Sequence, residues 1–181
     1  MLIERKLKRF TVALALAFVL GGCGDSQTTA NAVKPMTEFF AIKVGDRSIR
    51  AQIAVLPAEM EQGLMGRSSL GTDEGMLFVY MRPAPVQFWM RQCVLPLDIG
   101  YFDADGLLKE IYPMYPNDER PVPSRSRQIQ FALEMNQGWF HGNSVKPGAK
   151  LDREAIRKAL AARGFEPDRF GLKWGVLDHT P

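Results

Sequence analysis

Five side chains in the middle of the chain could together bind a small polar molecule. They comprise one tryptophan, one arginine and three acids: Glu61, Arg67, Trp89, Asp98 and Glu134. An aromatic plane beside fixed charges suits a ligand such as a sugar or an amino-acid-like molecule. The alternative is that Trp89 packs in the core, as aromatic residues in strands usually do, and that Arg67 pairs with an acid.

Glu134 is the strongest single candidate for a binding residue. Along its predicted strand the residues in phase with it are Gln130 and Ala132, and alternate residues of a strand share one face. Ser48, Arg50 and Gln52 alternate in the same way in another strand, so the sheet is expected to have one wet face.

The same region allows two catalytic alternatives. Asp98 and Glu134 would be the paired carboxylates of a hydrolase if their separation suits one, which a sequence does not give. Cys93 would be a nucleophile if His141 lay within hydrogen-bond reach as its base. Because no local signature surrounds Cys93, we expect no catalytic residue and a non-catalytic module.

The chain predicts neither a metal site nor a cofactor. Asp103 and Asp105 precede Gly106, but an EF-hand aligned on this glycine would need acids where Tyr101 and Tyr112 stand. These residues therefore indicate a turn. The nine methionines could favour Cu(I), although methionine in apolar strands usually fills gaps in a core.

The elements that position these residues indicate a mainly β fold, a compact antiparallel β-sandwich or small barrel with one or two short helices. Short apolar or alternating runs predict strands over residues 40–44, 49–55, 75–80, 87–90, 97–102, 107–112 and 129–135. Pro57 suits the first turn of a helix over 57–65, and Asp152 is placed to cap a second helix. Residues 113–127 contain four prolines and three arginines, which predicts a long loop and a candidate protein-binding surface.

The first 23 residues predict where the protein works. A positive segment precedes an apolar run, residues 10–20, which is too short to cross a bilayer because a spanning helix takes about 20 residues. Leu20-Gly21-Gly22-Cys23 follows. This order resembles the lipobox of bacterial lipoproteins, which implies a signal peptide over residues 1–22 and lipid attachment at Cys23. The alternative is an ordinary signal peptide with a chance cysteine.

A lipidated Cys23 would anchor the protein in the bacterial cell envelope, facing the periplasm. Residues 23–37 are polar without periodicity and predict a flexible tether. In lipoproteins of enteric bacteria, Asp directly after the cysteine retains the protein in the inner membrane, and Gly24 in that place favours the outer membrane. Cys93 is then left without an intramolecular partner, which excludes a disulfide scaffold.

The net charge of the chain limits the classes of partner that the protein is expected to bind. Four of its 23 basic residues and one of its 20 acidic residues lie in the leader, so the formal net charge of +3 belongs to the leader and the remainder is neutral. A neutral domain lacks the basic face that nucleic-acid binding requires. We therefore expect the membrane as a partner, through acylated Cys23, together with a small polar ligand or an envelope protein.

A series of motifs is similar to the family called domain of unknown function 192. The segments are EQGLMGRSSLGTDEGMLFVY from Glu61, FWMRQCVLPLD from Phe88, and later FALEMNQGW and VKPGAKL. The resemblance covers residues 49–151 and implies a compact β-sandwich-like domain that is often exported. It does not indicate any particular activity. The family's Lys-Asn-Thr is Arg91-Gln92-Cys93 here, so any ligand-holding role of that Asn or Thr is in doubt in this chain.

These expectations divide the chain into a signal peptide (1–22), a lipidated cysteine and tether (23–37), a β-rich family domain (38–151), and a C-terminal helix and tail (152–181) beyond the family core. The expected function is that of a membrane-tethered envelope lipoprotein with a non-catalytic ligand-binding or accessory module. The alternatives are a hydrolase or transferase acting on envelope polymers, and a structural partner protein that uses residues 113–127.

Overall fold

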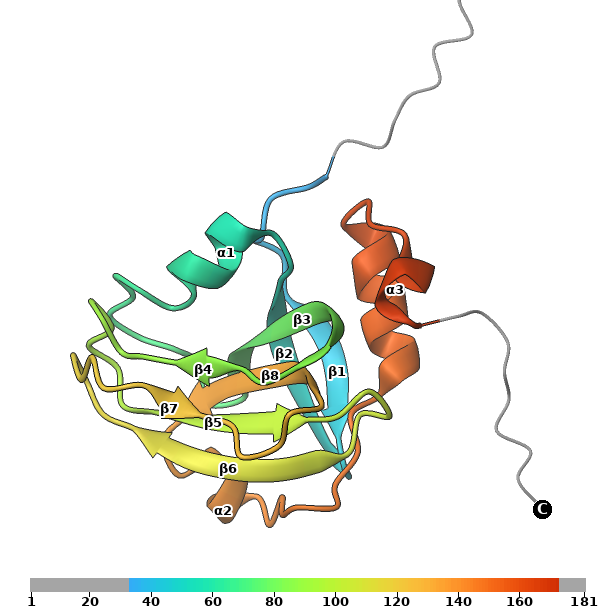
Figure 1. Cartoon of the computed structure of the whole chain (residues 1–181). Helices are drawn as coiled ribbons and strands as arrows, with labels where there is room; N and C mark the ends of the chain where they lie inside the picture. Colours follow the sequence, from blue (N-terminus) through green and yellow to red (C-terminus); the bar gives the residue numbers. More distant parts are fainter. Residues whose placement is uncertain (1–32, 173–181) are drawn as a thin grey trace, which may run out of the picture. The chain divides into compact units, whose positions relative to one another are not determined.

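A curved six-stranded sheet organises the part of the chain that the structure, a computed structural model, describes: residues 33–172 (Figure 1). The predicted signal peptide, Cys23 and the first part of the predicted tether lie outside the described residues, as does the end of the predicted tail. Within residues 33–172, no helix is both long enough and apolar enough to cross a membrane.

The sheet follows the strand order β1-β2-β3-β8-β5-β6. β1 (Phe40–Val44) and β2 (Arg47–Ala54) form the predicted hairpin, and its turn contains Gly45 with a φ of 59°, which glycine adopts without strain. β3 (Glu74–Ala84) pairs antiparallel with β8 (Ile129–Asn136). β5 (Leu97–Phe102) pairs antiparallel with both β8 and β6 (Leu108–Met114).

One pairing departs from the antiparallel sheet that the sequence predicts, because β2 and β3 run parallel. Parallel neighbours need a crossover connection, and here it contains α1 (Pro57–Gln62). The helix begins at Pro57, as predicted, but ends at Gln62 because Gly63 takes a φ of 47°. The crossover carries α1 and Arg67 over one face of the sheet.

Two hydrophobic cores lie on opposite faces of the sheet, since successive strand residues point in opposite directions. One face packs Leu133 and Met135 against α2 (Trp139–Gly142) and α3 (Arg153–Ala162), with the 3-10 turn η1 (Pro167–Phe170) beside them. The other face packs Phe78 and Tyr101 under a small second sheet of β4 (Gln87–Phe88) and β7 (Val122–Pro123).

The predicted fold class is confirmed. The described strands form two sheets without closing into a barrel, and three short helices accompany them, as in a compact β-sandwich. Residues 113–127, predicted as a loop, contain β7 and are held to the preceding segment by backbone hydrogen bonds. Met90 N–H donates to the Asp118 carbonyl at 2.8 Å, and Asn117 N–H donates to the Cys93 carbonyl at 2.9 Å.

Arg163, at the end of α3, joins the C-terminal helix to the rest of the domain. Its side chain is 1% exposed and donates hydrogen bonds to the carbonyls of Ile53 and Lys34 and to the carboxylate of Glu59. Burial alone would raise the pKa of Glu59, but Arg163 and the backbone N–H groups of residues 55 and 56 hold it below its ordinary value.

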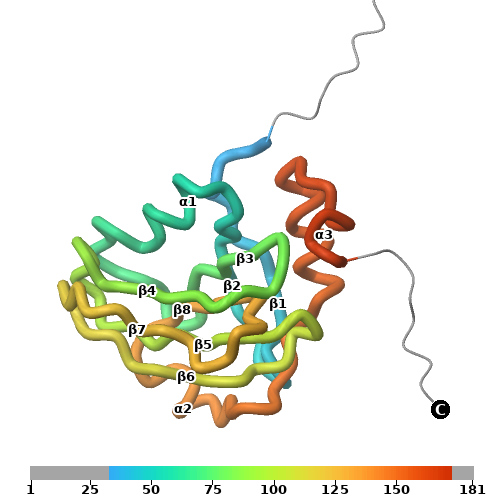
Figure 2. The backbone as a smooth tube through the Cα atoms, in the orientation of Figure 1, coloured from blue at the N-terminus to red at the C-terminus, as the bar shows by residue number. Residues whose placement is uncertain are grey.

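Two consequences follow for the predicted boundaries. The helix after Asp152, expected to lie outside the family domain, packs on its core, and the Asp152 carboxylate caps it by accepting from Ala155 N–H at 2.9 Å. Lys34, expected in the flexible tether, is bonded to Arg163 in both directions, because its own N–H donates to the Arg163 carbonyl at 2.9 Å. Figure 2 shows this start of the described chain, in blue, passing between α1 and α3.

We predict that Arg163→Met destabilises the protein by roughly 3–5 kcal/mol, because it leaves Glu59 buried without its cationic partner. Urea unfolding of the two proteins measures the difference. The control is Lys158→Met on the same helix, whose side chain is 68% exposed beside Glu154 and whose loss should cost less than about 0.5 kcal/mol. Equal losses in the two variants would contradict a joining role for Arg163.

Candidate functional site

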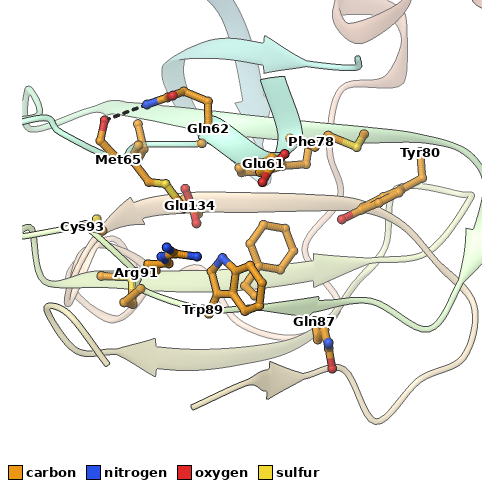
Figure 3. A pocket seen from close by; sticks show the side chains of 15 residues that line it. Glu61, Gln62, Met65, Phe78, Tyr80, Gln87, Trp89, Arg91, Cys93 and Glu134 are labelled. Carbon is orange, nitrogen blue, oxygen red and sulfur yellow. Dashed lines mark hydrogen bonds between the residues drawn. The ribbon is translucent and has the colours of Figure 1, made fainter. Parts of the chain in front are cut away.

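A pocket of about 400 Å³ opens on the face of the sheet that carries the small second sheet (Figure 3). Residues 60–65, from α1 and the turn after it, form one wall, and residues 87–91, from β4 and beyond, form the other. The central strands contribute Phe78, Tyr80 and Glu134 between these walls, and Cys93 also lines the pocket. The parallel crossover therefore builds half of the site, because it places α1 opposite β4.

Glu134 projects into this pocket from the middle of the sheet. In β8 it lies between Met76 of β3 and Ile99 of β5, and its side chain shares their face. The residue is only 5% exposed, and its Oε2 makes no hydrogen bond. Burial raises the pKa of Glu134 to about 8, against an opposing effect of Arg67. The carboxyl is therefore mostly protonated at neutral pH.

Arg67 lies close enough to attract Glu134 but is bonded elsewhere. Its guanidinium donates a hydrogen bond to Gln52 of β2, whose own amide donates to the Thr37 carbonyl at 3.1 Å. This chain of hydrogen bonds fixes a positive charge behind the acid without neutralising it. Gln52 itself is 4% exposed, so the face of β2 that the sequence predicts to be wet is buried at this position.

Trp89 lies at the pocket mouth, with 48% of its surface exposed. Phe88 is the residue of β4 that packs inward, with its ring edge-to-face on Phe78 at 4.8 Å between centroids. Trp89 directly follows β4 and points outward. In Figure 3, Arg91 lies beside Trp89, while Glu61 projects from α1 on the opposite wall.

Two phenols and one thiol near Glu134 stay neutral around pH 7. Burial, with a smaller effect of the Glu134 charge, raises the pKa of Tyr80 to about 12. Burial also raises the pKa of Tyr101, whose hydroxyl donates to the Val122 carbonyl. The pKa of the Cys93 thiol is raised, again chiefly by burial. A buried, protonated thiol is a poor nucleophile.

Asp98 lies away from the pocket. Ile99, its neighbour in β5, pairs with Glu134, so Asp98 points to the opposite face of the sheet. There its Oδ2 accepts a hydrogen bond from Gly138 N–H at 2.8 Å, directly before α2. Burial raises the pKa of Asp98, although this hydrogen bond opposes the rise. The carboxyl fixes a turn and forms no pair with Glu134.

The structure thus brings together most of the residues that the sequence singles out. Glu61, Trp89 and Glu134 line one pocket, Arg67 lies behind Glu134, and Asp98 lies on the other face. Neither catalytic alternative is assembled, because the two carboxylates are on opposite faces and the residues that line the pocket with Cys93 do not include His141. Tyr80 and Gln52 were not predicted as site residues, because the sequence shows each of them only as a polar group in a strand.

Metal-ligating groups are not clustered in the described part of the chain. Among residues 33–172, no three His, Cys, Asp or Glu side chains are grouped so that they could hold a metal ion. The Asp103 carboxylate accepts from the N–H groups of Asp105 and Leu107 at 3.1 and 2.9 Å, as in the turn that the sequence indicates.

The model of the family described as domain of unknown function 192, an uncharacterised family, matches residues 40–153, more than half of the chain. The chain belongs to this family. The match extends the resemblance seen in the sequence to β1 at one end and to the start of α3 at the other. Among curated proteins, none matches.

Two solved structures resemble this member of the domain of unknown function 192 family. One, a putative transcription regulator from Sinorhizobium meliloti, is 30% identical with a TM-score of 0.62, over 66% of this chain and 96% of that one. The other, a protein of unknown function from Novosphingobium aromaticivorans, is 33% identical with a TM-score of 0.61, over 71% of this chain and 99% of that one. These likenesses support the family and the fold.

We predict that Glu134→Gln stabilises the protein at pH 8 and has much less effect at pH 5. The pKa of Glu134 is about 8 in the folded protein against an ordinary 4.5, so the folded state binds the proton more tightly. Its contribution to stability is therefore present at low pH and is lost as the pH rises from about 4.5 to 8. The amide should remove this loss, which amounts to a few kcal/mol.

Thermal unfolding from pH 5 to pH 8 measures the effect, at about 2–4 °C per kcal/mol for a domain of this size. Glu61→Gln is the control, because it removes an exposed carboxylate of the same pocket and should change the profile little. A Glu134→Gln protein with the same pH profile as the wild type would show that this carboxyl is not a cost to folding.

Proposed function

We propose that this protein is a lipid-anchored module of the bacterial cell envelope that binds a small polar ligand between α1 and β4. One observation carries the proposal: Glu134 is buried in an open pocket with its Oε2 unpartnered. A buried polar group without a partner costs about 1–3 kcal/mol or more. A residue that lowers stability in this way is typical of a functional site.

The pocket suits a small molecule in size and lining. Its volume of about 400 Å³ lies in the range of ligand sites, roughly 300–1,000 Å³. Phe78 and Met90 supply apolar surface, Trp89 supplies an exposed aromatic plane, and the acids supply directional contacts. This combination of apolar surface and a few fixed polar groups is what binding sites use for orientation.

Binding fits the geometry better than catalysis does. General acid–base chemistry needs a second group within hydrogen-bond reach, and hydrolysis by two carboxylates needs both on one site. Glu134 has no carboxylate partner on its strand neighbours, because Asp98 points away. Cys93 has a raised pKa, and the residues that line the pocket include no histidine to act as its base.

The envelope location rests on the sequence of the leader and on the lipobox-like segment that ends at Cys23. Acyl chains on this cysteine contribute about 0.8 kcal/mol for each buried methylene, and stable anchoring takes more than one chain. Arg163 is hydrogen-bonded to both Lys34 and Glu59. The proposed tether would therefore join the domain close to α1, the helix that forms one pocket wall.

We predict that Cys23→Ser releases the protein from the membrane, because it removes the proposed acylation site. Cells that express either form are fractionated, and the protein is followed by immunoblotting, with metabolic labelling by a fatty acid as a second readout. Cys93→Ser is the control, because that thiol is buried in the domain and should not affect anchoring. A Cys23→Ser protein that remains membrane-bound and labelled would contradict the anchor.

We predict that a ligand of this pocket raises the melting temperature of the wild-type protein and not of Trp89→Ala. The panel contains sugars, muropeptide fragments, amino acids and simple amines, each with the full-length protein in detergent. A ligand at a hundred times its dissociation constant adds about 2.7 kcal/mol. Tyr115→Ala is the control, because Tyr115 is an exposed aromatic residue, 55% accessible, outside the pocket lining. A panel without any shift would count against a small-molecule site.

A further inference from the structure

We propose that the group bound against Glu134 is a primary ammonium, such as an amino sugar, an amino acid or a simple amine carries. This inference rests on the proposed binding function and names the chemistry of its ligand. The juxtaposition that supports it is a buried, unpartnered carboxyl, a second acid on the α1 wall, and an exposed tryptophan on the opposite wall of the same pocket.

Once ionised, the Glu134 carboxyl has an open position at Oε2 for a hydrogen-bond donor of the ligand. Oε2 is buried and accepts nothing from the protein. Gly63 borders it, and a Cβ at that position would come within 4.0 Å of Oε2 and 3.5 Å of the Phe78 ring. Gly63 therefore places no side-chain atom against the carboxyl, and an ammonium is a compact donor with three N–H bonds.

The charges around Glu134 also favour a cationic ligand. Three neutral groups lie near Glu134: Tyr80 and Tyr101 from the sheet, and Cys93 from the segment after β4. Arg67 is committed to Gln52. Glu61 on α1 adds a second negative charge, and Arg91 by Trp89 is the cation of the mouth.

Among the residues that line the pocket, a ligand cation would thus meet two acids and an aromatic plane, and the lining base, Arg91, lies at the mouth. Aromatic faces attract cations, most strongly those of tryptophan. A carboxylate elsewhere on the same ligand would be able to meet Arg91, which is why an amino acid is among the candidate sources.

A carboxyl can become negatively charged when an ammonium binds, whereas the amide of glutamine cannot. A ligand hydroxyl would be served equally well by glutamine, which has no charge to bury. An ammonium draws the proton off Glu134, so that the neutral acid becomes a carboxylate and one proton passes to solvent as the cation binds. Cation binding and proton release are then linked.

This linkage fixes the pH dependence. Because the pKa of Glu134 in the empty protein is about 8, a cation that keeps its own charge should bind roughly tenfold more tightly for each pH unit from 6 to 7. The affinity should level off above pH 8. An uncharged ligand that hydrogen-bonds the protonated acid would weaken over the same interval or stay constant.

The test compares matched pairs that differ in one group: n-butylamine with n-butanol, and glucosamine with glucose. Alanine is compared with lactate as a third pair. Dissociation constants are measured by NMR titration of the full-length protein in detergent. We expect the amine of at least one pair to bind at least tenfold more tightly than its partner, and the pair that responds identifies the source. The pH series uses n-butylamine, which stays protonated throughout.

Single substitutions distinguish the contributions of Glu134 and Glu61 to amine binding. Glu134→Gln should weaken the amine by roughly 10- to 100-fold, the usual effect of losing a charged hydrogen bond, and should abolish the pH dependence. Glu61→Gln should weaken it several-fold and leave the pH dependence in place. Tyr115→Ala, outside the pocket, should leave both unchanged.

The outcomes distinguish this inference from the proposed function. If butanol or glucose binds as tightly as the amine and Trp89→Ala removes that binding, the pocket is a ligand site and the ammonium inference is wrong. If neither member of any pair binds, and the broader ligand panel also gives no shift, both proposals fail. If the amine binds with no pH dependence or independently of Glu134, the inference is likewise overturned.

Discussion

The burial of the Glu134 carboxyl constrains the whole pocket face of the sheet. Its neighbours across the strands, Met76 and Ile99, are apolar, and its Oε2 meets no donor. Arg67 would satisfy it but is held by Gln52 instead. The surrounding phenols and thiol add no charge, because burial raises each pKa. On this face the Glu134 Oε2 is therefore a buried oxygen that no donor of the described residues satisfies.

Glu59 and Arg163, in contrast, are charged side chains whose hydrogen bonds are all made within the protein. Arg163 is more completely buried than Glu134, yet it donates to two carbonyls and a carboxylate, and Glu59 also accepts from two backbone N–H groups. This network fixes the start of α1, and α1 carries Met60 and Glu61 into the pocket wall. The fully hydrogen-bonded Arg163 thus holds in place the helix that borders the unpartnered Glu134 carboxyl, an arrangement suited to a preorganised site.

Local patterns predicted most strands, the first hairpin, the helix start at Pro57 and the cap at Asp152. They could not predict which face each residue takes in the assembled sheet. Asp98 and Glu134 both lie in motif strands, and only the pairing of Glu134 with Ile99 places them on opposite faces. The parallel β2–β3 pairing was missed, although its crossover helix was predicted, because a local pattern does not give the relative direction of two strands; the burial of Gln52 against Arg67 was missed with it.

The segment Arg91-Gln92-Cys93 explains one departure from the family pattern in backbone terms. Gln92 has a φ of 53°, and its carbonyl accepts from Gly66 N–H at 3.0 Å. Asparagine tolerates this left-handed conformation better than glutamine, so the family's Asn fits the turn without any ligand contact. Arg91 and Cys93, in contrast, line the same pocket as Glu134. The departure from the family pattern therefore falls on the pocket wall that begins at β4. Since a fold hosts many functions, the difference at this wall is where the ligand preference of the chain would be set.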